Sequence, residues 1–329
     1  MKRILMSTVA TLLVAATGAW AQPVPAASGQ PQPFAAGLPL GVTVQDARTP
    51  LSSNVKVFGA IVNAESCAYD VDRKLIVAVN RGANQNEVPN DGFVSLINSD
   101  GSVHTARWIG QNRNGLVLNQ PFGSDIQNGR LYVADRNGGT ADGAPSVSVI
   151  RWFDMKTGAP MGEIAVPDSP GFNDIEVAAD GTIYASQTGG GPAKLPMRLF
   201  KVTADGRASV LVDGDPLSLP NGVGIDNDGN IVVLNMGDDR VLTFSPQGSL
   251  IRTERAAQPG SDGLVILPDG VKYVSSVAQG GVSRIRPGRP AELIATGIPS
   301  AASMCFDPNR RQLVIPMNPN NALAFVKLE

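Results

Sequence analysis

Residues 221–234, NGVGIDNDGNIVVL, place two short apolar runs on either side of the turn dipeptide Asp228-Gly229. Asp-Gly supplies the positive φ angles of tight hairpin turns, so this stretch predicts two antiparallel strands joined by a short turn. A polar residue, Asn221, opens the first strand, and the second strand begins ten residues later at Ile231. We therefore expect a β-hairpin here, within an all-β protein.

The same hairpin pattern recurs along the chain with a regular period. The polar residues that open these hairpins are Glu65, Asn173, Asn221, Asp262 and Ser303. The last four starts lie 48, 41 and 41 residues apart, and the 108 residues between the first two hold two units. The additional unit begins near Gly123 with a shorter first hairpin and an ambiguous register. Repeats of roughly 40–50 residues with four short strands are typical of β-propeller blades, so the sequence predicts a six-bladed β-propeller. The alternative, two β-sandwiches, lacks such a period.

The two ends of the repeat region are expected to share one blade. The last unit contains three strands and ends at about Lys327, and the run from Val55 to Phe58 supplies the missing outer strand. This N-terminal strand would join the last blade, close the ring and remove most exposed sheet edges.

Two cysteines, Cys67 and Cys305, each stand two residues after the first position of their unit, in the first and last blades. Those blades are neighbours in a closed ring, so a disulfide is possible in an oxidising compartment. The alternative is two small buried apolar residues with Cα atoms further apart than the roughly 7 Å limit of a disulfide.

The N-terminus has the features of a secretory signal peptide. A basic start, Lys2-Arg3, precedes an apolar run over residues 4–20, and small residues flank a cleavage site after Ala21. The alternative is a membrane anchor, since the run is nearly long enough to span a bilayer. We expect a signal peptide over residues 1–21, a Pro-rich linker over 22–45 and the propeller over 46–329. The mature chain would then be periplasmic or secreted, with no membrane span.

Charge and histidine content exclude several classes of function. The chain has 27 basic and 29 acidic side chains, and this near-neutral balance argues against nucleic acid as a partner. It has one histidine, His104, so chemistry that needs two imidazoles within one chain is excluded.

The repeat predicts a polar ring around the central channel, because the inner strand of each blade begins there. Glu65 and Asp262 would bring two carboxylates into this ring, and Asn173 and Asn221 two amides. Buried neighbouring carboxylates need positive charge, and no Lys or Arg occurs at the repeat position. A hard cation such as Ca²⁺, which binds roughly six to eight oxygens, suits this set, whereas zinc or copper would favour His or Cys. The alternative is that these residues merely begin strands, as turn residues do.

With these residues at these positions, the chain resembles the senescence marker protein/gluconolactonase family of regucalcin-like six-bladed propellers. The resemblance covers about residues 50–329 and rests on Glu65 and the elements Phe172-Asn173-Asp174, Pro220-Asn221-Gly222 and Ser261-Asp262-Gly263. It implies that Glu65, Asn221 and Asp262 hold a divalent cation. It also implies that Asn173 contacts the substrate or a metal-bound water.

The chain departs from the family pattern at two places. It reads Glu65-Ser66-Cys67-Ala68-Tyr69 where members commonly have Glu-Gly-Pro-x-Trp, and Gly171 stands where gluconolactonase-like members often carry arginine. The second departure puts a sugar-lactone substrate in doubt. Paraoxonases, which look similar at the four ring positions, use a histidine pair that this chain cannot supply.

Two functions are compatible with these observations. The first is a Ca²⁺-dependent hydrolase of a small-molecule lactone or ester, in which Asp262 or Glu65 accepts a proton and Asn173 and Asn221 orient the substrate oxygen and the water. The second is a non-enzymatic propeller that binds a ligand or protein partner around a structural cation.

Overall fold

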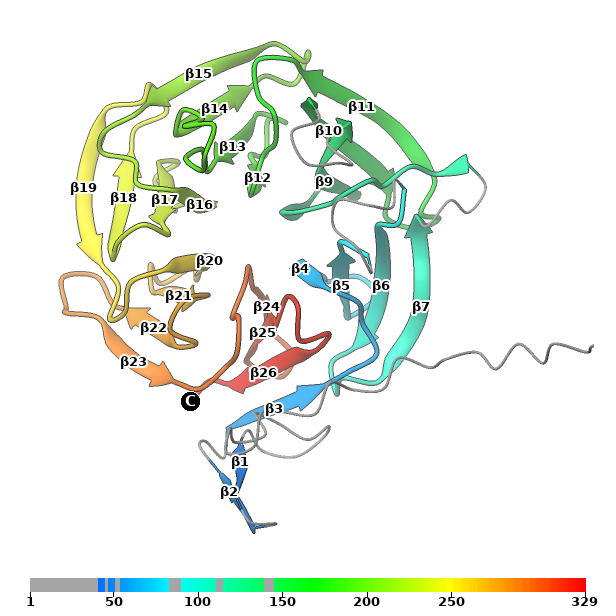
Figure 1. Ribbon diagram of the computed structural model, residues 1–329, viewed down its shortest axis with the longest axis vertical. Coiled ribbons are helices and arrows are strands. Elements are labelled where there is room, and N and C mark those ends of the chain that lie inside the picture. The colour runs from blue at the N-terminus through cyan, green and yellow to red at the C-terminus, as the bar shows by residue number, and fades with distance from the viewer. Residues whose placement is uncertain (1–40, 45–46, 51–53, 83–89, 111–114, 139–144) are drawn as a thin grey trace, which may run out of the picture.

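The computed structural model describes residues 41–44, 47–50, 54–82, 90–110, 115–138 and 145–329. Six four-stranded antiparallel sheets surround a central axis as the blades of a β-propeller, which confirms the predicted fold (Figure 1). The predicted signal peptide and most of the predicted linker lie outside the described residues. Among the residues described, no helix is long and apolar enough to cross a membrane.

Each blade has an inner strand beside the channel, two middle strands and an outer strand. Blade 1 consists of β4 (Ala64–Asp70), β5 (Leu75–Asn80), β6 (Phe93–Asn98) and β7 (Val103–Gly110). Blade 2 consists of β8 (Ser124–Gln127), β9 (Arg130–Gly138), β10 (Ser146–Asp154) and β11 (Pro160–Val166). Blade 3 consists of β12 (Ile175–Val177), β13 (Ile183–Gln187), β14 (Arg198–Val202) and β15 (Ala208–Asp213). Blade 4 consists of β16 (Pro220–Ile225), β17 (Ile231–Asn235), β18 (Arg240–Phe244) and β19 (Leu250–Arg255). Blade 5 consists of β20 (Ser261–Ile266), β21 (Lys272–Ser276), β22 (Val282–Ile285) and β23 (Glu292–Ala295). Blade 6 consists of β24 (Cys305–Asp307), β25 (Gln312–Pro316), β26 (Leu323–Lys327) and β3 (Val55–Phe58). A separate pair, β1 (Gly41–Val44) and β2 (Ala47–Pro50), lies outside the ring, so the predicted linker region contains a strand at its end.

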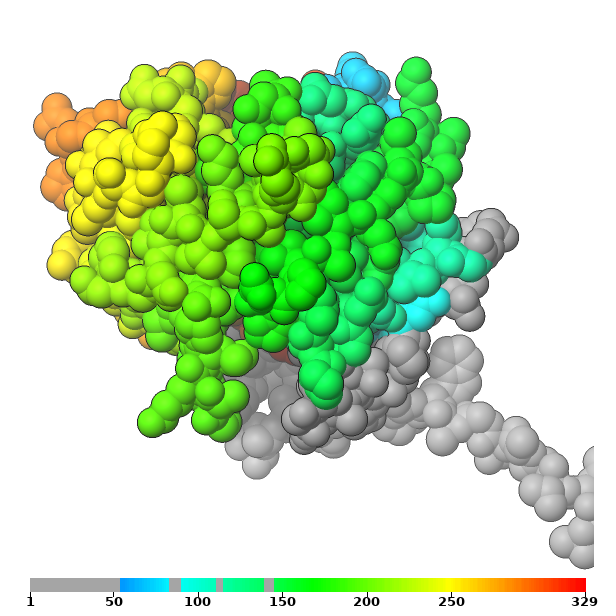
Figure 2. Space-filling model, turned by 90° about the horizontal axis from the view of Figure 1, so that it is seen from above, coloured from blue at the N-terminus to red at the C-terminus, as the bar shows by residue number. Residues whose placement is uncertain are grey.

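The core is divided among the blade interfaces. The second strand of a blade packs between neighbouring blades on both faces, so β5, β13, β17, β21 and β25 are buried along their whole length. This burial explains the largely apolar sequences of β5, β17 and β25. The strands β13 and β21 also bury polar side chains, among them Gln187 and Lys272. Buried apolar side chains of the described residues form six clusters, one at each interface between adjacent blades. The outer strands are mostly exposed, and Figure 2 shows their continuous surface from blade 2 in green to blade 4 in yellow.

A strand pairing and a disulfide help to close the ring, and both join blade 6 to the N-terminal part of the chain. β3 pairs antiparallel with β26, with Val57 opposite Ala324, as the sequence predicted. Cys67 of β4 and Cys305 of β24 form a disulfide with a Cα–Cα distance of 5.4 Å. The disulfide confirms the first of the two alternatives for the cysteines, because at this point the inner strands of blades 1 and 6 lie closer than the 7 Å limit.

Candidate functional site

A bulge at the start of the inner strand presents the ring residues to the channel. Glu65 of β4, Asn221 of β16 and Asp262 of β20 all fall where the pairing between the inner and second strands shifts by one residue. A bulge leaves such residues outside the regular pairing and turns their side chains, and bulges are frequent beside active sites. Asn173 lies just before β12, at the corresponding place in blade 3.

The glycines of the Asn-Gly and Asp-Gly elements allow the inner strands to approach one another. A Cβ on Gly222 would lie 2.2 Å from the carbonyl oxygen of Asp262 in the next blade. A Cβ on Gly263 would likewise lie 2.5 Å from the backbone nitrogen of Met304. Both contacts are too close for any side chain, so glycine is needed here for close backbone approach.

Strand pairing defines the register of blade 2, which the sequence left ambiguous. Ser124 pairs with Val133 as Val223 pairs with Val233 in blade 4, and Phe122 therefore stands at the position of Asn221. A Gln127–Arg130 pair closes the shorter hairpin of this blade around Asn128 and Gly129, both with positive φ. Blade 2 thus contributes an aromatic ring where its neighbours contribute polar groups, and a search for polar residues overlooked it.

Asn221 and Asp262 meet directly in the ring. The Asn221 Nδ2 donates to Asp262 Oδ2 at 3.1 Å, and both side chains are buried. The other amide atom, Asn221 Oδ1, is buried and has no hydrogen-bond partner among the described residues. A buried acceptor without a donor is costly, so a ligand that accepts its lone pair would stabilise this arrangement.

Glu65, the second ring carboxylate, pairs with an arginine that the search of the repeat position did not find. Arg81 Nη1 lies 3.2 Å from Glu65 Oε2, and Asn318 Nδ2 also donates to that oxygen. The guanidinium of Arg81 packs on the ring of Phe122, with 4.1 Å from its central carbon to the ring centroid. Arg81 therefore brings positive charge to the ring from the end of the second strand of blade 1. The prediction that a bound cation alone balances the charge of the ring carboxylates is incomplete.

Burial and mutual repulsion raise the pKa values of two acids beside the channel, Asp262 and Asp174. Burial raises the pKa of Asp262 well above its usual range, and the negative charges of Glu65 and Asp174 add to the effect. Burial also raises the pKa of Asp174 to about 7, although its carboxylate accepts a hydrogen bond from Val223 N at 3.0 Å. The shared charge interactions show that Glu65, Asp174 and Asp262 form one electrostatic group beside Asn221.

Asn173 lines a cavity of about 230 Å³ beside this group. Phe122, Arg136 and Thr188 also line it, so the cavity extends from the ring toward blades 2 and 3. A second cavity of about 180 Å³ lies against the inner strands, and Asp125, Asp174 and the two cysteines of the disulfide line it. The structure therefore brings Glu65, Asn221 and Asp262 into one group and places Asn173 at an adjoining cavity.

The donor set around the channel fits a hard cation. Among the described residues, no group of three or more His, Cys, Asp and Glu side chains could hold a metal on its own. A cation here would depend on amide oxygens beside the two ring carboxylates, and the partnerless Asn221 Oδ1 is such an oxygen. Carboxylate and amide oxygens together are ligands that Ca²⁺ accepts.

A second repeat position supplies the basic residues of the site. Asn80, Asp135 and Asn235 are equivalent, because each accepts a hydrogen bond from the loop before its own inner strand. The residue that follows is Arg81 in blade 1 and Arg136 in blade 2. In blade 4 it is Met236, whose sulfur lies 3.7 Å from Asn221 Nδ2, so this position faces the ring. Comparison of the ends of the second strands would have revealed both arginines from sequence.

Known proteins show the same architecture. A gluconolactonase from Xanthomonas campestris is 18% identical in sequence, with a TM-score of 0.59. The aligned region covers 85% of this chain and 91% of the gluconolactonase chain. Virginiamycin B lyase from Staphylococcus aureus is 12% identical in sequence, with a TM-score of 0.57. The aligned region covers 84% of this chain and 99% of the lyase chain. At these identities the likeness shows the fold alone. A sequence search of curated proteins finds no match.

The family is shown by a sequence model rather than by these structures. The model described as the SMP-30/gluconolactonase/LRE-like region matches residues 70–317, about three quarters of the chain. The match runs from the first blade to the last and includes three of the four predicted ring residues. This chain therefore belongs to the SMP-30/gluconolactonase/LRE-like family.

Proposed function

We propose that this protein is a divalent-cation-dependent hydrolase that opens a lactone or cleaves an ester, with Ca²⁺ as the expected ion. The observation that carries the proposal is the buried Asn221 Oδ1, which lacks a partner among the described residues and lies beside the carboxylate of Asp262. Family membership supports a small-molecule substrate, and the cavity beside Asn173 offers space for one.

The oxygens of Glu65, Asn173, Asn221 and Asp262 would hold the cation. When bound, a divalent cation supplies Lewis-acid polarisation of the substrate carbonyl. Arg81, held by Glu65, adds positive charge where the carbonyl oxygen becomes negative during attack. The Asn173 amide donates to an oxygen of the substrate and so orients the carbonyl at the edge of the cavity.

Asp262 serves as the general base in this proposal. Its buried carboxylate lies in the ring beside the Asn221 amide, where it can take a proton from the attacking water. The water oxygen bonds to the carbonyl carbon while Asp262 takes the proton. The carbon–oxygen bond to the leaving oxygen then breaks, and Asp262 returns the proton to that oxygen. The products are a carboxylic acid and an alcohol, joined in one molecule when the substrate is a lactone.

We further propose that the chain is exported after cleavage following Ala21, and that it acts in the periplasm or outside the cell. The Cys67–Cys305 disulfide supports this proposal, because disulfides persist in oxidising compartments. N-terminal sequencing of the protein recovered from the periplasm and the medium tests it, with Gln22 expected as the first residue.

The test is a panel of lactones and aryl esters assayed with added Ca²⁺ and with chelator. Hydrolysis should require the cation, and Asp262→Asn should lower kcat by about 10²–10⁴, the usual contribution of a general base. Asp228→Asn, an exposed acid on a hairpin turn, is the matched control and should retain full activity. Full activity in both chelator and Asp262→Asn would refute the mechanism. Loss of thermal stability on chelation, with no hydrolysis of any substrate by the wild type, would favour a structural cation in a binding protein.

A further inference from the structure

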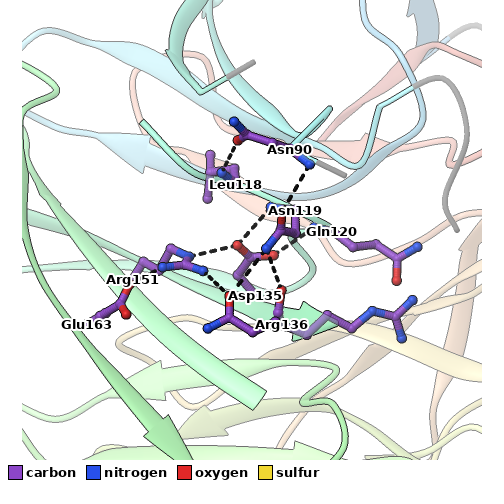
Figure 3. Close-up of polar contacts among 9 residues, drawn as sticks. Asn90, Leu118, Asn119, Gln120, Asp135, Arg136, Arg151 and Glu163 are labelled. Atoms are coloured by element: carbon purple, nitrogen blue, oxygen red, sulfur yellow. Dashed lines mark hydrogen bonds and ion pairs between the residues drawn. The ribbon is translucent and has the colours of Figure 1, made fainter. Parts of the chain in front are cut away.

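Gln187, the last residue of β13, stands at the repeat position that Asp135 and Asn235 occupy in blades 2 and 4. The pairing between the inner and second strands has the same register in blades 3 and 4, and it makes Gln187 equivalent to Asn235. In blades 1, 2 and 4 the side chain at this position accepts a hydrogen bond from a backbone nitrogen of the loop before its own inner strand. Figure 3 shows the arrangement in blade 2, where Asn119 and Gln120 donate to Asp135.

Blade 3 lacks this backbone donor. The loop residue that donates is Val62 in blade 1, Asn119 in blade 2 and Ser218 in blade 4, each three positions before the ring position of its blade. The corresponding residue of blade 3 is Pro170, and proline has no N–H to donate. Gln187 is 1% exposed, and its Oε1 has no hydrogen-bond partner among the described residues. The missing donor therefore explains why this buried oxygen is unpaired.

The orientation of the Gln187 amide is fixed by its other end. Nε2 donates to the carbonyl oxygen of Pro196 at 2.7 Å, and a carbonyl oxygen only accepts, so the nitrogen and the oxygen of the amide cannot exchange places. Pro196 follows a short hairpin in which the backbones of Gly190 and Leu195 exchange two hydrogen bonds. Gln187 and Leu195 both line the cavity of about 230 Å³ beside Asn173. The wall of this cavity thus holds a buried acceptor that no donor of the described residues reaches.

The surroundings of Gln187 favour a neutral hydrogen-bond donor as the partner of this oxygen. A buried acceptor without a donor is costly, so a ligand that brings a donor is favoured over one that does not. None of the described residues that line the cavity is an acid, so the charge of an ammonium group would remain unbalanced there. A hydroxyl or an amide N–H supplies the donor without the charge.

We propose that Gln187 is a specificity determinant that accepts a hydrogen bond from a hydroxyl or an amide N–H of the substrate. The proposal rests on the proposed function, because it names the substrate class of that same site: a lactone or ester that carries a neutral donor group beside the reacting carbonyl. A site that pairs a buried polar group with its substrate rejects an analogue without the matching group, because its own group is then left unpaired. Pro170 has a part in this selection, since it withholds the backbone donor that would otherwise occupy the oxygen.

Matched pairs of lactones test the proposal. α-Hydroxy- and α-methyl-γ-butyrolactone differ in a hydroxyl against a methyl group, as do γ-hydroxymethyl- and γ-ethyl-γ-butyrolactone. α-Acetamido-γ-butyrolactone and its N-methyl derivative differ in an amide N–H. The wild type should prefer the donor-bearing member of at least one pair by about tenfold or more in kcat/KM, and the preferred pair identifies the donor. Equal kcat/KM values within all three pairs overturn the proposal.

Two variants and a control assign the preference to Gln187. Gln187→Met removes the acceptor and keeps the length of the side chain, so it should reduce the preference about tenfold, mainly through the donor-bearing lactone. Pro170→Ala returns a backbone N–H to the loop, which should occupy Gln187 Oε1 and lower the same preference with the Gln187 side chain intact. Gln247→Met, on an exposed turn of blade 4, should match the wild type. An unchanged preference in folded Gln187→Met overturns the proposal.

A binding measurement separates failure of this proposal from failure of the proposed function. If the wild type hydrolyses none of the six lactones and none of the esters in the panel above, the proposed function fails. Calorimetric titration of the wild type with the same lactones then still tests the cavity. Binding of a donor-bearing lactone that is about tenfold tighter than binding of its partner, and loss of this difference in Gln187→Met, support the role of Gln187. No binding, or equal binding within every pair, overturns it.

Discussion

Replacing Cys67 and Cys305 together by alanine removes the covalent link between the first and last blades. The two residues are 238 positions apart, so the disulfide closes a loop that contains most of the propeller. Both side chains are buried at the blade 6–blade 1 interface, where the cluster of apolar side chains and the β3–β26 pairing remain in the variant. We therefore expect the variant to fold, with the same ring closed by non-covalent contacts alone.

The expected loss of stability follows from the length of the loop. A cross-link lowers the entropy of the unfolded chain by an amount that grows with the logarithm of the loop length, and a loop of this size corresponds to about 5 kcal/mol at 25 °C. Disulfides often stabilise by less than this chain-entropy value, so about 3–5 kcal/mol is the expected decrease in the free energy of unfolding. Removal of two sulfur atoms from a buried interface adds a smaller cavity cost in the same direction.

Urea denaturation, followed by tryptophan fluorescence and circular dichroism and checked for reversibility, measures this loss. Reduction of the wild type should reproduce the stability of the double variant, and reductant should leave the double variant unchanged. A double variant within about 1 kcal/mol of the oxidised wild type would refute the reasoning. That result would mean that the unfolded chain keeps its two ends together without the disulfide.

Two more substitutions test the channel. Burial raises the pKa of Asp125 to about 6, so its ionisation in the folded state costs stability as the pH rises from about 4 to about 6. Asp125→Asn should therefore gain up to about 3 kcal/mol relative to the wild type between pH 4 and pH 7, measured by urea denaturation, and a difference that does not vary with pH would contradict this. Gly222→Ala should lower stability by about 1–3 kcal/mol and reduce hydrolysis, because the new Cβ would displace the strand that carries Asp262. Gly171→Ala, with no atom within 4 Å of the new Cβ, should change stability by less than about 0.5 kcal/mol in the same assay.

Five of the six blades could be predicted from sequence because their hairpins are local structures. In each of these blades a turn and two apolar runs follow one another within some fifteen residues, and the spacing from the polar residue to the second strand is constant. Blade 2 was less clear, because its hairpin is shorter and its ring position holds Phe122 in place of a polar residue. Its register followed only from the strand pairing in the structure.

The ring residues Glu65, Asn221 and Asp262 were predicted as one group because they share a repeat position, and the structure places them together. Arg81 and Arg136 also share a repeat position, but most other blades have uncharged residues there, so no common chemistry drew attention to it. Their place beside Phe122 depends on how blades 1 to 3 pack against each other.

The sequence by itself therefore determined the blades, their number and the polar character of the channel. These properties follow from turns, strand periodicity and a repeat that can be read along the chain. Only the tertiary structure decided that Cys67 meets Cys305, that Arg81 pairs with Glu65 and that Arg136 faces the cavity beside Asn173. Each of these contacts joins different strands, and most join different blades, so it depends on distances that are set by the twist of the sheets and the closure of the ring.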